Sequence, residues 1–252
     1  MSSNRLRVLL VSMLAVFAVS AVASSSASAQ QFFVPCHKVI AANKGLGEWE
    51  NNTCTVAGGT KEFTTKLLAG ETETITDSSG ISLLESEVGG VKVLIECDED
   101  ISSGTLEEAG KTKGTIKFIK CRFFEIKTGA KTLLNACTVK TPIEFEFRDK
   151  AIVGKGVGPE EEFFPTAANK KLFVSITLEG ATCALKGTYE ATTTEENKGI
   201  FCALPEGWVA KLFHEIVCTS TGDERLKFGT AKASYTSTDT ARLTSGGLWY
   251  VE

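Results

Sequence analysis

The chain has 252 residues and a formal net charge of −4, with 27 Lys and Arg against 31 Asp and Glu. Lysines and glutamates are interleaved along the chain and form no basic stripe, which argues against nucleic acid as a partner. The length remaining after the first thirty residues suits one large β domain, or one main domain with a small appendage.

The N-terminus has the pattern of a secretory signal peptide. Arg5 and Arg7 precede an apolar run from Val8 to Ala23, and Ala27-Ser28-Ala29 supplies small residues for cleavage. The run is shorter than the roughly 20 residues that cross a bilayer. We predict a signal peptide over residues 1–29, no transmembrane span in the mature chain, and a secreted, extracellular or cell-envelope location.

All eight cysteines follow the predicted cleavage site, and their even number predicts four disulfides in an oxidising compartment. We favour the sequential pairing, because each neighbouring pair brackets a plausible hairpin or strand pair. The cysteines in that order are Cys36 with Cys54, Cys97 with Cys121, Cys137 with Cys183, and Cys202 with Cys218.

Residues 30–70 differ slightly from the rest of the chain. They contain two cysteines, Trp49, and turn-forming glycines at 45, 47, 58 and 59. We interpret this segment as a small disulfide-closed hairpin that docks on a main β domain over residues 71–252.

The main domain consists of short segments in which apolar and polar residues alternate. Ile143, Phe145 and Phe147 alternate with charged residues, which predicts a strand with one buried face. Residues 172–178 alternate in the same way, but their second face is partly apolar, so that strand is expected to be central or covered. Residues 91–97 and 116–121 are predicted to be partners joined by Cys97 and Cys121.

Helix signals are weak, and residues 163–171 are interpreted as a loop with one helical turn. Further strands are expected around residues 208–218 and 226–235, among others. The pattern predicts an all-β fold, a disulfide-stapled antiparallel β-sandwich or barrel.

Candidate catalytic and metal-binding groups are few. His214-Glu215 begins like a zinc-peptidase motif, but Cys218 stands where the second histidine belongs and the flanking pattern is that of a strand. Cys202, His214 and Cys218 could form a zinc site only if both cysteines were reduced. No catalytic residue, metal ligand or cofactor is therefore assigned.

Acidic clusters occur at Glu96–Asp100, Glu107-Glu108, Glu160–Glu162 and Glu195-Glu196. Two carboxylates facing a cleft could act as acid and base on a glycoside. Solvated loop charge is the simpler interpretation. Asp98-Glu99-Asp100 could also supply oxygen ligands to calcium, although it lacks the spacing of an EF-hand loop.

Aromatic residues could form a stacking surface for sugars, while core filling is the ordinary alternative. Trp249 and Tyr250 are the weak ligand-binding candidates, because chain termini are usually exposed. The partner that such a surface would take is a cell-wall or extracellular polysaccharide.

Three segments carry a family resemblance. They are Gly47-Glu48-Trp49-Glu50-Asn51-Asn52-Thr53-Cys54 after Cys36, then Ile95-Glu96-Cys97, and Phe118-Ile119-Lys120-Cys121 with the later Cys137. The chain resembles a loose group of exported, cysteine-containing, β-rich bacterial proteins with no established function. The resemblance transfers no catalytic or binding residue.

The sequence thus leads us to expect a non-enzymatic structural or binding β scaffold at the cell surface or in the medium. The alternatives are a secreted glycan-acting hydrolase that uses Asp/Glu pairs, and a carbohydrate-binding module.

Overall fold

The structure is a computed structural model that describes residues 33–252 apart from 69, 108–110, 154–157, 167–169 and 220–224. The signal peptide predicted for residues 1–29 lies outside the described residues, as does Glu108. Within the described part, regular structure is β-strand except for one short 3-10 helix, η1 (Ala41–Asn43). The predicted all-β class is confirmed.

Eight strand positions close into an antiparallel barrel, so of the two predicted architectures the barrel is the one that forms. Its strands are β4 (Glu73–Ser79), β5 (Ser82–Val88), β6 (Val91–Glu107), β7 (Lys111–Lys127), β10 (Ile143–Ile152), β11 (Glu160–Pro165), β14 (Ile200–Ala203), β15 (His214–Thr219) and β18 (Ser234–Leu243). β4 and β5 share one position, because each pairs with both β6 and β18. The other strands follow in the order β6, β7, β10, β11, β14, β15, β18.

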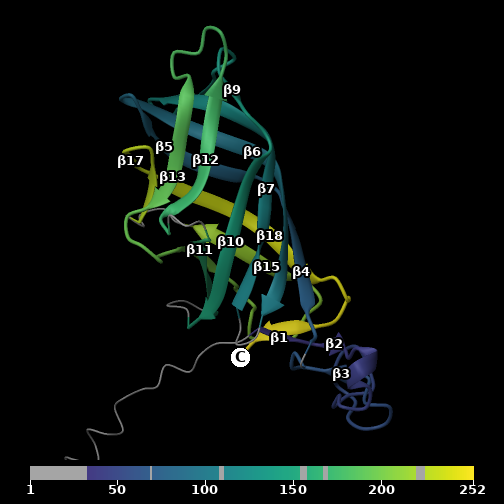
Figure 1. The fold of residues 1–252 in the computed structure, drawn as a ribbon. Coiled ribbons are helices and arrows are strands. Elements are labelled where there is room, and N and C mark those ends of the chain that lie inside the picture. Colours follow the sequence, from purple (N-terminus) through teal and green to yellow (C-terminus); the bar gives the residue numbers. More distant parts are fainter. Residues whose placement is uncertain (1–32, 69, 108–110, 154–157, 167–169, 220–224) are drawn as a thin grey trace, which may run out of the picture. The chain divides into compact units, whose positions relative to one another are not determined.

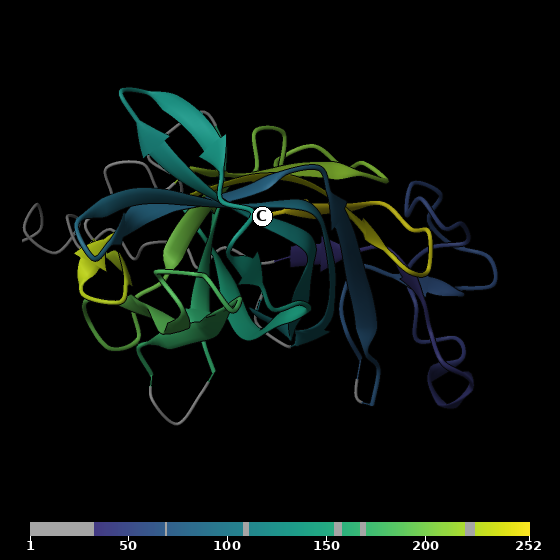
Figure 2. The same ribbon diagram turned by 90° about the horizontal axis from the view of Figure 1, so that it is seen from above.

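A second sheet has five strands and packs against the barrel. It consists of β17 (Ala231–Lys232), β16 (Leu226–Phe228), β13 (Gly187–Thr193), β12 (Leu172–Glu179) and β9 (Thr138–Val139), in that order. Ile176 and Leu178 of β12 pack with Val93, Ile95 and Phe123 of the barrel strands in one core cluster. Figures 1 and 2 show β12 and β13 beside the barrel strands. β12 is an inner strand of its sheet, as predicted.

The remaining strands are short. β8 (Ala130–Leu133) extends the barrel sheet beside β7, β1 (Phe33–Pro35) pairs with β19 (Trp249–Val251), and β2 (His37–Lys38) pairs with β3 (Phe63–Thr64). In Figure 1, β1, β2 and β3 lie at the end of the barrel away from the five-stranded sheet.

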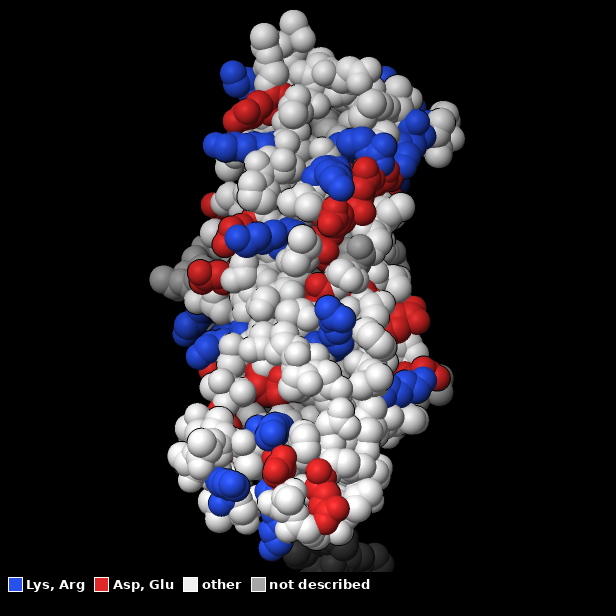
Figure 3. All heavy atoms as spheres, turned by 90° about the vertical axis from the view of Figure 1, so that its right-hand side faces the viewer, with Lys and Arg blue, Asp and Glu red and all other residues white. Residues whose placement is uncertain are grey.

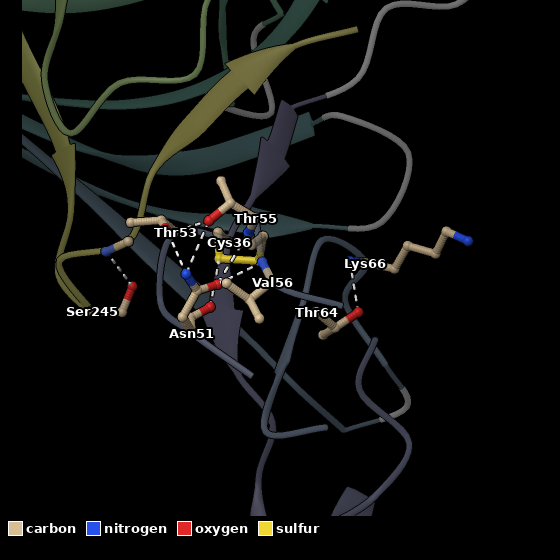
Figure 4. Close-up of a disulfide and its surroundings, with 10 residues drawn as sticks. Cys36, Asn51, Thr53, Thr55, Val56, Thr64, Lys66 and Ser245 are labelled. Carbon is tan, nitrogen blue, oxygen red and sulfur yellow. Dashed lines mark hydrogen bonds between the residues drawn. A yellow bond between two sulfur atoms is a disulfide. The ribbon is translucent and has the colours of Figure 1, made fainter. Parts of the chain in front are cut away.

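The loop that Cys36 and Cys54 close is organised by Asn51. The Asn51 side-chain oxygen accepts hydrogen bonds from the backbone N–H groups of Thr55 (3.0 Å) and Val56 (3.2 Å), and its amide nitrogen donates to Thr53 Oγ1 (2.8 Å). Figure 4 shows Asn51 beside the disulfide. The side chain therefore satisfies backbone groups in a segment that has little regular structure of its own.

Alternate side chains of the barrel strands face inward and form the interior of the barrel. Ile143, Phe145 and Phe147 of β10 are buried and their charged neighbours are exposed, as predicted. Phe145 and Phe147 pack with Ile216, Leu243 and other apolar groups in the barrel core, and Ile143 packs in the cluster that includes Ile176 and Leu178. Gly104 and Gly114 face each other across β6 and β7. A Cβ at Gly114 would lie 2.9 Å from the Phe147 ring, so glycine lets that ring lie close to the barrel wall.

The alternation of buried and exposed side chains along the strand shifts by one residue within β6 and β7. Cys97 and Asp100 are both buried, whereas Asp98 and Glu99 between them are not. Opposite this point, Lys120 has a left-handed φ of 54°. The shift turns Asp100 toward the interior, where continued alternation would have placed Glu99.

Four disulfides join Cys36–Cys54, Cys97–Cys121, Cys137–Cys183 and Cys202–Cys218, the pairs of the sequential scheme. Two of them join residues directly opposite each other on adjacent strands, in β6 with β7 and in β14 with β15. A set of four disulfides is typical of an oxidising compartment.

Two expected elements differ from the structure. Residues 160–165 form β11 and not part of a loop, because Glu161 and Phe163 face inward while the strand pairs with β10 and β14. The run of three glutamates hides this alternation. Of the strand expected over 208–218, only residues from His214 onward are extended, and Trp208, Val209 and Phe213 are exposed in the preceding turn.

Surface charge of both signs is mixed. Figure 3 shows Lys and Arg side chains interspersed with Asp and Glu on one face. In the part of the chain that is described, no helix has the length and apolar character needed to cross a bilayer.

Candidate functional site

A cavity of about 90 Å³ lies where the barrel meets the five-stranded sheet. The second sheet contributes one wall through Phe173 and Val174 of β12, with Ile176, Ala191 and Leu226. A register shift in β12 between Leu172 and Val174 lets the consecutive residues Phe173 and Val174 both reach the cavity. The cavity therefore depends on the packing of two sheets and not on a single loop.

The barrel lines the cavity with two chemically different walls. Strands β7, β10, β11 and β14 contribute only apolar side chains, which are Ile116, Phe118, Ile143, Phe145, Phe163 and Ile200. Aromatic and branched side chains of this kind suit the hydrocarbon part of a small ligand.

The polar wall comes from the neighbouring strands β4, β5, β6 and β18. It consists of Asp77, Ser82, Asp100, Tyr235 and Asp239. Ser82 Oγ donates a hydrogen bond to Asp100, and Tyr235 donates to Ser82 Oγ at 3.5 Å. Ser237 Oγ donates to Asp239 at 2.9 Å. Strand pairing brings these groups together, because β4 and β5 lie between β6 and β18.

Two further carboxylates are buried near this wall. Asp149 continues the inward face of β10 beyond Phe147, and Glu161 faces inward from β11. The backbone N–H of Thr112 donates to Asp149 Oδ1 at 3.1 Å. Five strands or strand segments thus contribute the interior carboxylates Asp77, Asp100, Asp149, Glu161 and Asp239.

Burial and mutual repulsion raise the pKa values of Asp77, Asp149 and Glu161. Burial and the neighbouring charge of Asp100 raise the pKa of Asp77 to about 6, against hydrogen bonds from Ser102 that lower it. Burial, with Asp77 nearby, raises the pKa of Asp149 to about 7. The pKa of Glu161 is raised well above its ordinary value by burial and by Asp149, Asp77 and Asp239. Tyr235 also has a raised pKa, because it is buried beside Asp239 and Asp100.

Two buried carboxylates outside this group, Glu96 and Glu162, have cationic partners. Glu96 accepts from Arg122 at 2.8 Å and also pairs with Lys131. Glu162 pairs with Lys150 at 3.3 Å. By contrast, no Lys or Arg is buried among the residues that the structure describes. The charge of Asp77, Asp149 and Glu161 is instead limited by protonation.

An oxygen of the Asp77 carboxylate, in the cavity wall, is unsatisfied. Asp77 Oδ1 is buried and has no hydrogen-bond partner among the described residues. A buried acceptor of this kind is energetically unfavourable unless a donor reaches it. The cavity therefore offers a position where a ligand's donor group would be stabilised.

The zinc site considered from the sequence does not form. Cys202 and Cys218 are joined in a disulfide, so neither supplies a thiolate. His214 is buried, with Nε2 2.7 Å from the Trp249 carbonyl oxygen. Burial lowers the pKa of His214, despite the hydrogen bond from its ring to that carbonyl.

Trp249, a weak candidate for an exposed sugar-stacking surface, is buried. Trp249 is 0% exposed, with its ring 4.2 Å from the His214 ring and 6.1 Å from the Phe33 ring between centroids. The terminal strand pairs with β1, which covers this residue. Tyr250 is half-buried on the same strand.

The predicted acidic clusters are divided by the fold. Asp98 pairs with Arg122 and Glu99 with Lys120 on the outside, whereas Asp100 faces inward, so the three do not converge as calcium ligands. No group of three or more potential metal-ligating side chains is found within the described ranges. Among the described residues of the four clusters, only Asp100 and Glu161 belong to the interior group.

Sequence reasoning missed Asp77, Asp149 and Asp239. Asp149 carried a usable signal, because it continues the buried face of Ile143, Phe145 and Phe147 by one more alternation. Asp77 lies in a Ser- and Thr-rich strand without such an apolar frame. Asp239 shares its buried face with Ala241 and Leu243, a signal that was not used.

Comparisons with known proteins provide no further guide to this cavity. No protein-family model, curated protein or solved structure matches the chain significantly.

Proposed function

We propose that the protein is an exported, non-enzymatic binding protein whose barrel holds a small organic ligand in the internal cavity. The observation that carries the proposal is the cavity itself, which has an apolar wall and a carboxylate wall contributed by different strands. An eight-stranded barrel is wide enough either to be filled by its own side chains or to hold one small ligand.

The cavity volume sets the size of the ligand. A cavity of about 150 Å³ holds benzene, so by proportion one of about 90 Å³ holds about four non-hydrogen atoms. The best ligands of that size bind with a dissociation constant on the order of 10⁻⁵ M, given a ceiling of about 1.5 kcal/mol per atom.

The alternative of a glycan-acting hydrolase is supported less well. The acidic residues that the fold brings together line or adjoin a small internal cavity. A hexose ring has more than twice the non-hydrogen atoms that this volume accommodates. A sugar-binding surface built on Trp249 has no support either, because that residue is buried.

Export to the cell surface or the medium is part of the proposal. It is supported by the sequence pattern of residues 1–29 and by the four disulfides. Resemblance to exported, cysteine-containing β-rich bacterial proteins agrees with this location.

The test is titration of the oxidised protein with small neutral and charged organic probes at millimolar concentration, observed through side-chain methyl resonances. We expect the methyl groups of Ile116 and Ile176, from the two sheets that line the cavity, to shift with at least one probe. Ala191→Phe would fill the cavity and abolish the shifts, whereas Ala130→Phe on exposed β8 would not. Probes that leave all cavity methyl groups unshifted would refute the proposal.

A further inference from the structure

The two walls of the cavity differ in chemistry, and this difference indicates which ligand fits. Every polar lining residue comes from β4, β5, β6 or β18, and the five-stranded sheet opposite contributes only apolar residues. A ligand that matches both walls has a compact polar group at one end and a short hydrocarbon part at the other.

The polar group is best satisfied by a hydrogen-bond donor with positive charge. Asp77, Asp100 and Asp239 present carboxyl groups to the cavity. When ionised, these groups accept hydrogen bonds and have no proton to donate. Asp77 Oδ1 lacks a hydrogen-bond partner within the described residues. An ammonium group has three donors and a positive charge, and charge-assisted hydrogen bonds are the stronger kind.

Size and geometry argue against a guanidinium group and against a divalent metal ion. A guanidinium group alone has four non-hydrogen atoms, which would fill the volume and leave no part for the apolar wall. A divalent metal ion requires several oxygen ligands around it, but one side of this cavity is entirely apolar, and the described residues hold no metal-ligating cluster.

We propose that the cavity binds a small primary amine, with its ammonium group against Asp77, Asp100 and Asp239 and its alkyl group against Phe173, Val174 and Ile176 of the second sheet. This rests on the proposed function of the cavity as a ligand site. An amine of about four non-hydrogen atoms fits the volume.

Binding of the ammonium group releases a proton from the protein. The titrating groups that face the site are Asp77 on β4, Asp100 on β6, Asp149 on β10, Glu161 on β11, and Tyr235 and Asp239 on β18. With a pKa of about 6, Asp77 is mostly protonated at about pH 5 and mostly ionised at about pH 7.5. The affinity for an amine therefore rises roughly tenfold over that interval, while the affinity for a neutral ligand does not rise.

The experiment compares n-propylammonium with 1-propanol, which has the same number of non-hydrogen atoms and no charge. Dissociation constants are measured for the oxidised protein at about pH 5 and about pH 7.5, from the methyl shifts of Ile116 and Ile176. We expect n-propylammonium to bind about tenfold more tightly than 1-propanol at the higher pH, with little preference at the lower pH.

Asp77→Asn removes one charge and keeps the side-chain shape, so it should remove most of the preference for the amine while 1-propanol still binds. Glu144→Gln is the matched control, because Glu144 is exposed and pairs with Lys117 on the outside. It should leave both affinities unchanged. If Asp77→Asn fails to fold, the pH dependence and the position of the shifted methyl groups in the unsubstituted protein still decide the result.

The outcomes separate the two proposals. Binding of 1-propanol as tightly as n-propylammonium at both pH values would overturn the amine assignment and leave the proposed binding function intact. The same holds if n-propylammonium shifts only surface resonances. If neither probe nor any other small molecule shifts the cavity methyl groups, both proposals fail.

Discussion

Glu71 near the N-terminus and Asp149 in the barrel are both buried, yet their pKa values shift in opposite directions. Burial raises the pKa of Glu71, but hydrogen bonds from Asn43, His37 and two backbone N–H groups outweigh it and lower the value to about 2. Asp149 accepts hydrogen bonds from Thr112 and has other carboxylates nearby, and burial raises its pKa to about 7. The comparison shows that the number of donors, and not burial alone, decides whether an interior carboxylate keeps its charge.

The two regions accordingly have different roles. Around Glu71, His37 Nε2 lies 2.9 Å from Oε2, and Ile40 N and Asn43 Nδ2 donate to Oε1 at 2.9 and 3.0 Å. The carboxylate is saturated and holds its segment together. In the barrel, burial and neighbouring carboxylates instead raise the pKa values of Asp77 and Asp149. Under our proposal, the site exchanges a proton for a cationic ligand.

Removal of Glu71 should give the largest loss of stability. Glu71→Ala leaves the buried His37 ring and two partly buried backbone N–H groups without their acceptor. We expect a decrease of about 3–5 kcal/mol in the free energy of unfolding, measured in urea. Glu62→Ala, at an exposed pair with Lys38, should change it by less than about 1 kcal/mol. Equal effects of the two substitutions would contradict the conclusion that the hydrogen bonds of Glu71 hold its segment together.

The pH dependence of stability should separate the two regions. The barrel carboxylates have raised pKa values in the folded state, so their contribution favours folding at low pH and is lost as pH rises through about 6 and 7. We expect the free energy of unfolding to fall by on the order of 3 kcal/mol between about pH 5 and pH 8.

Below about pH 4.5 the Glu71 contribution acts in the other direction. Its lowered pKa means that stability is present above the ordinary value and is lost as pH falls toward about 2. The lowered pKa of buried His214 also disfavours folding as pH falls below about 6.5. This single contribution is smaller than the combined contribution of the barrel carboxylates, which favours folding at low pH. Stability should therefore be greatest near about pH 4, where the unfolded carboxyls begin to ionise, and a maximum above neutrality in urea titrations would contradict the raised pKa values of the barrel carboxylates.

Neutralising one barrel carboxylate should stabilise the protein at alkaline pH. Asp149→Asn keeps an oxygen to accept from the Thr112 N–H and removes a charge that burial disfavours. The expected gain is about 2 kcal/mol at about pH 8 and less than about 1 kcal/mol at about pH 5. Urea unfolding at both pH values measures it. Destabilisation at both would show that the Asp149 charge is compensated.

Neutralising an outer carboxylate should have the smallest effect. Glu144→Gln breaks a 3.4 Å pair with Lys117 between two half-exposed side chains. We expect a change within about 0.5 kcal/mol at either pH. A pH-dependent gain like that of Asp149→Asn would mean that net charge, and not the interior, controls the response.

The local sequence pattern predicted much of the fold but little of the cavity and its interior carboxylates. Alternation identified the buried face of residues 143–147, and proximity in sequence gave the disulfide pairs. Closure of the barrel depends on pairings such as β18 with β4, whose residues lie far apart in the chain. The interior carboxylates come from five separate segments, so only this closure brings them together.

The errors have physical causes too. Trp249 was expected at the surface because it is close to the terminus, but β19 pairs with β1 and buries it. Glu161 was hidden between two glutamates, one of which faces the Lys150 ammonium. Asp100 faces the cavity only because the alternation shifts opposite Lys120, a local irregularity that residue types do not reveal.

Titration of the Asp and Glu side-chain carboxyl carbons by NMR, with and without n-propylammonium, tests the central claim most directly. We predict midpoints near pH 6 for Asp77 and pH 7 for Asp149, both lowered by the amine, and a midpoint near 2 for Glu71 that the amine does not move. Ordinary midpoints near about pH 4 for Asp77 and Asp149, or midpoints that the amine leaves unchanged, would contradict a proton-holding, amine-binding barrel.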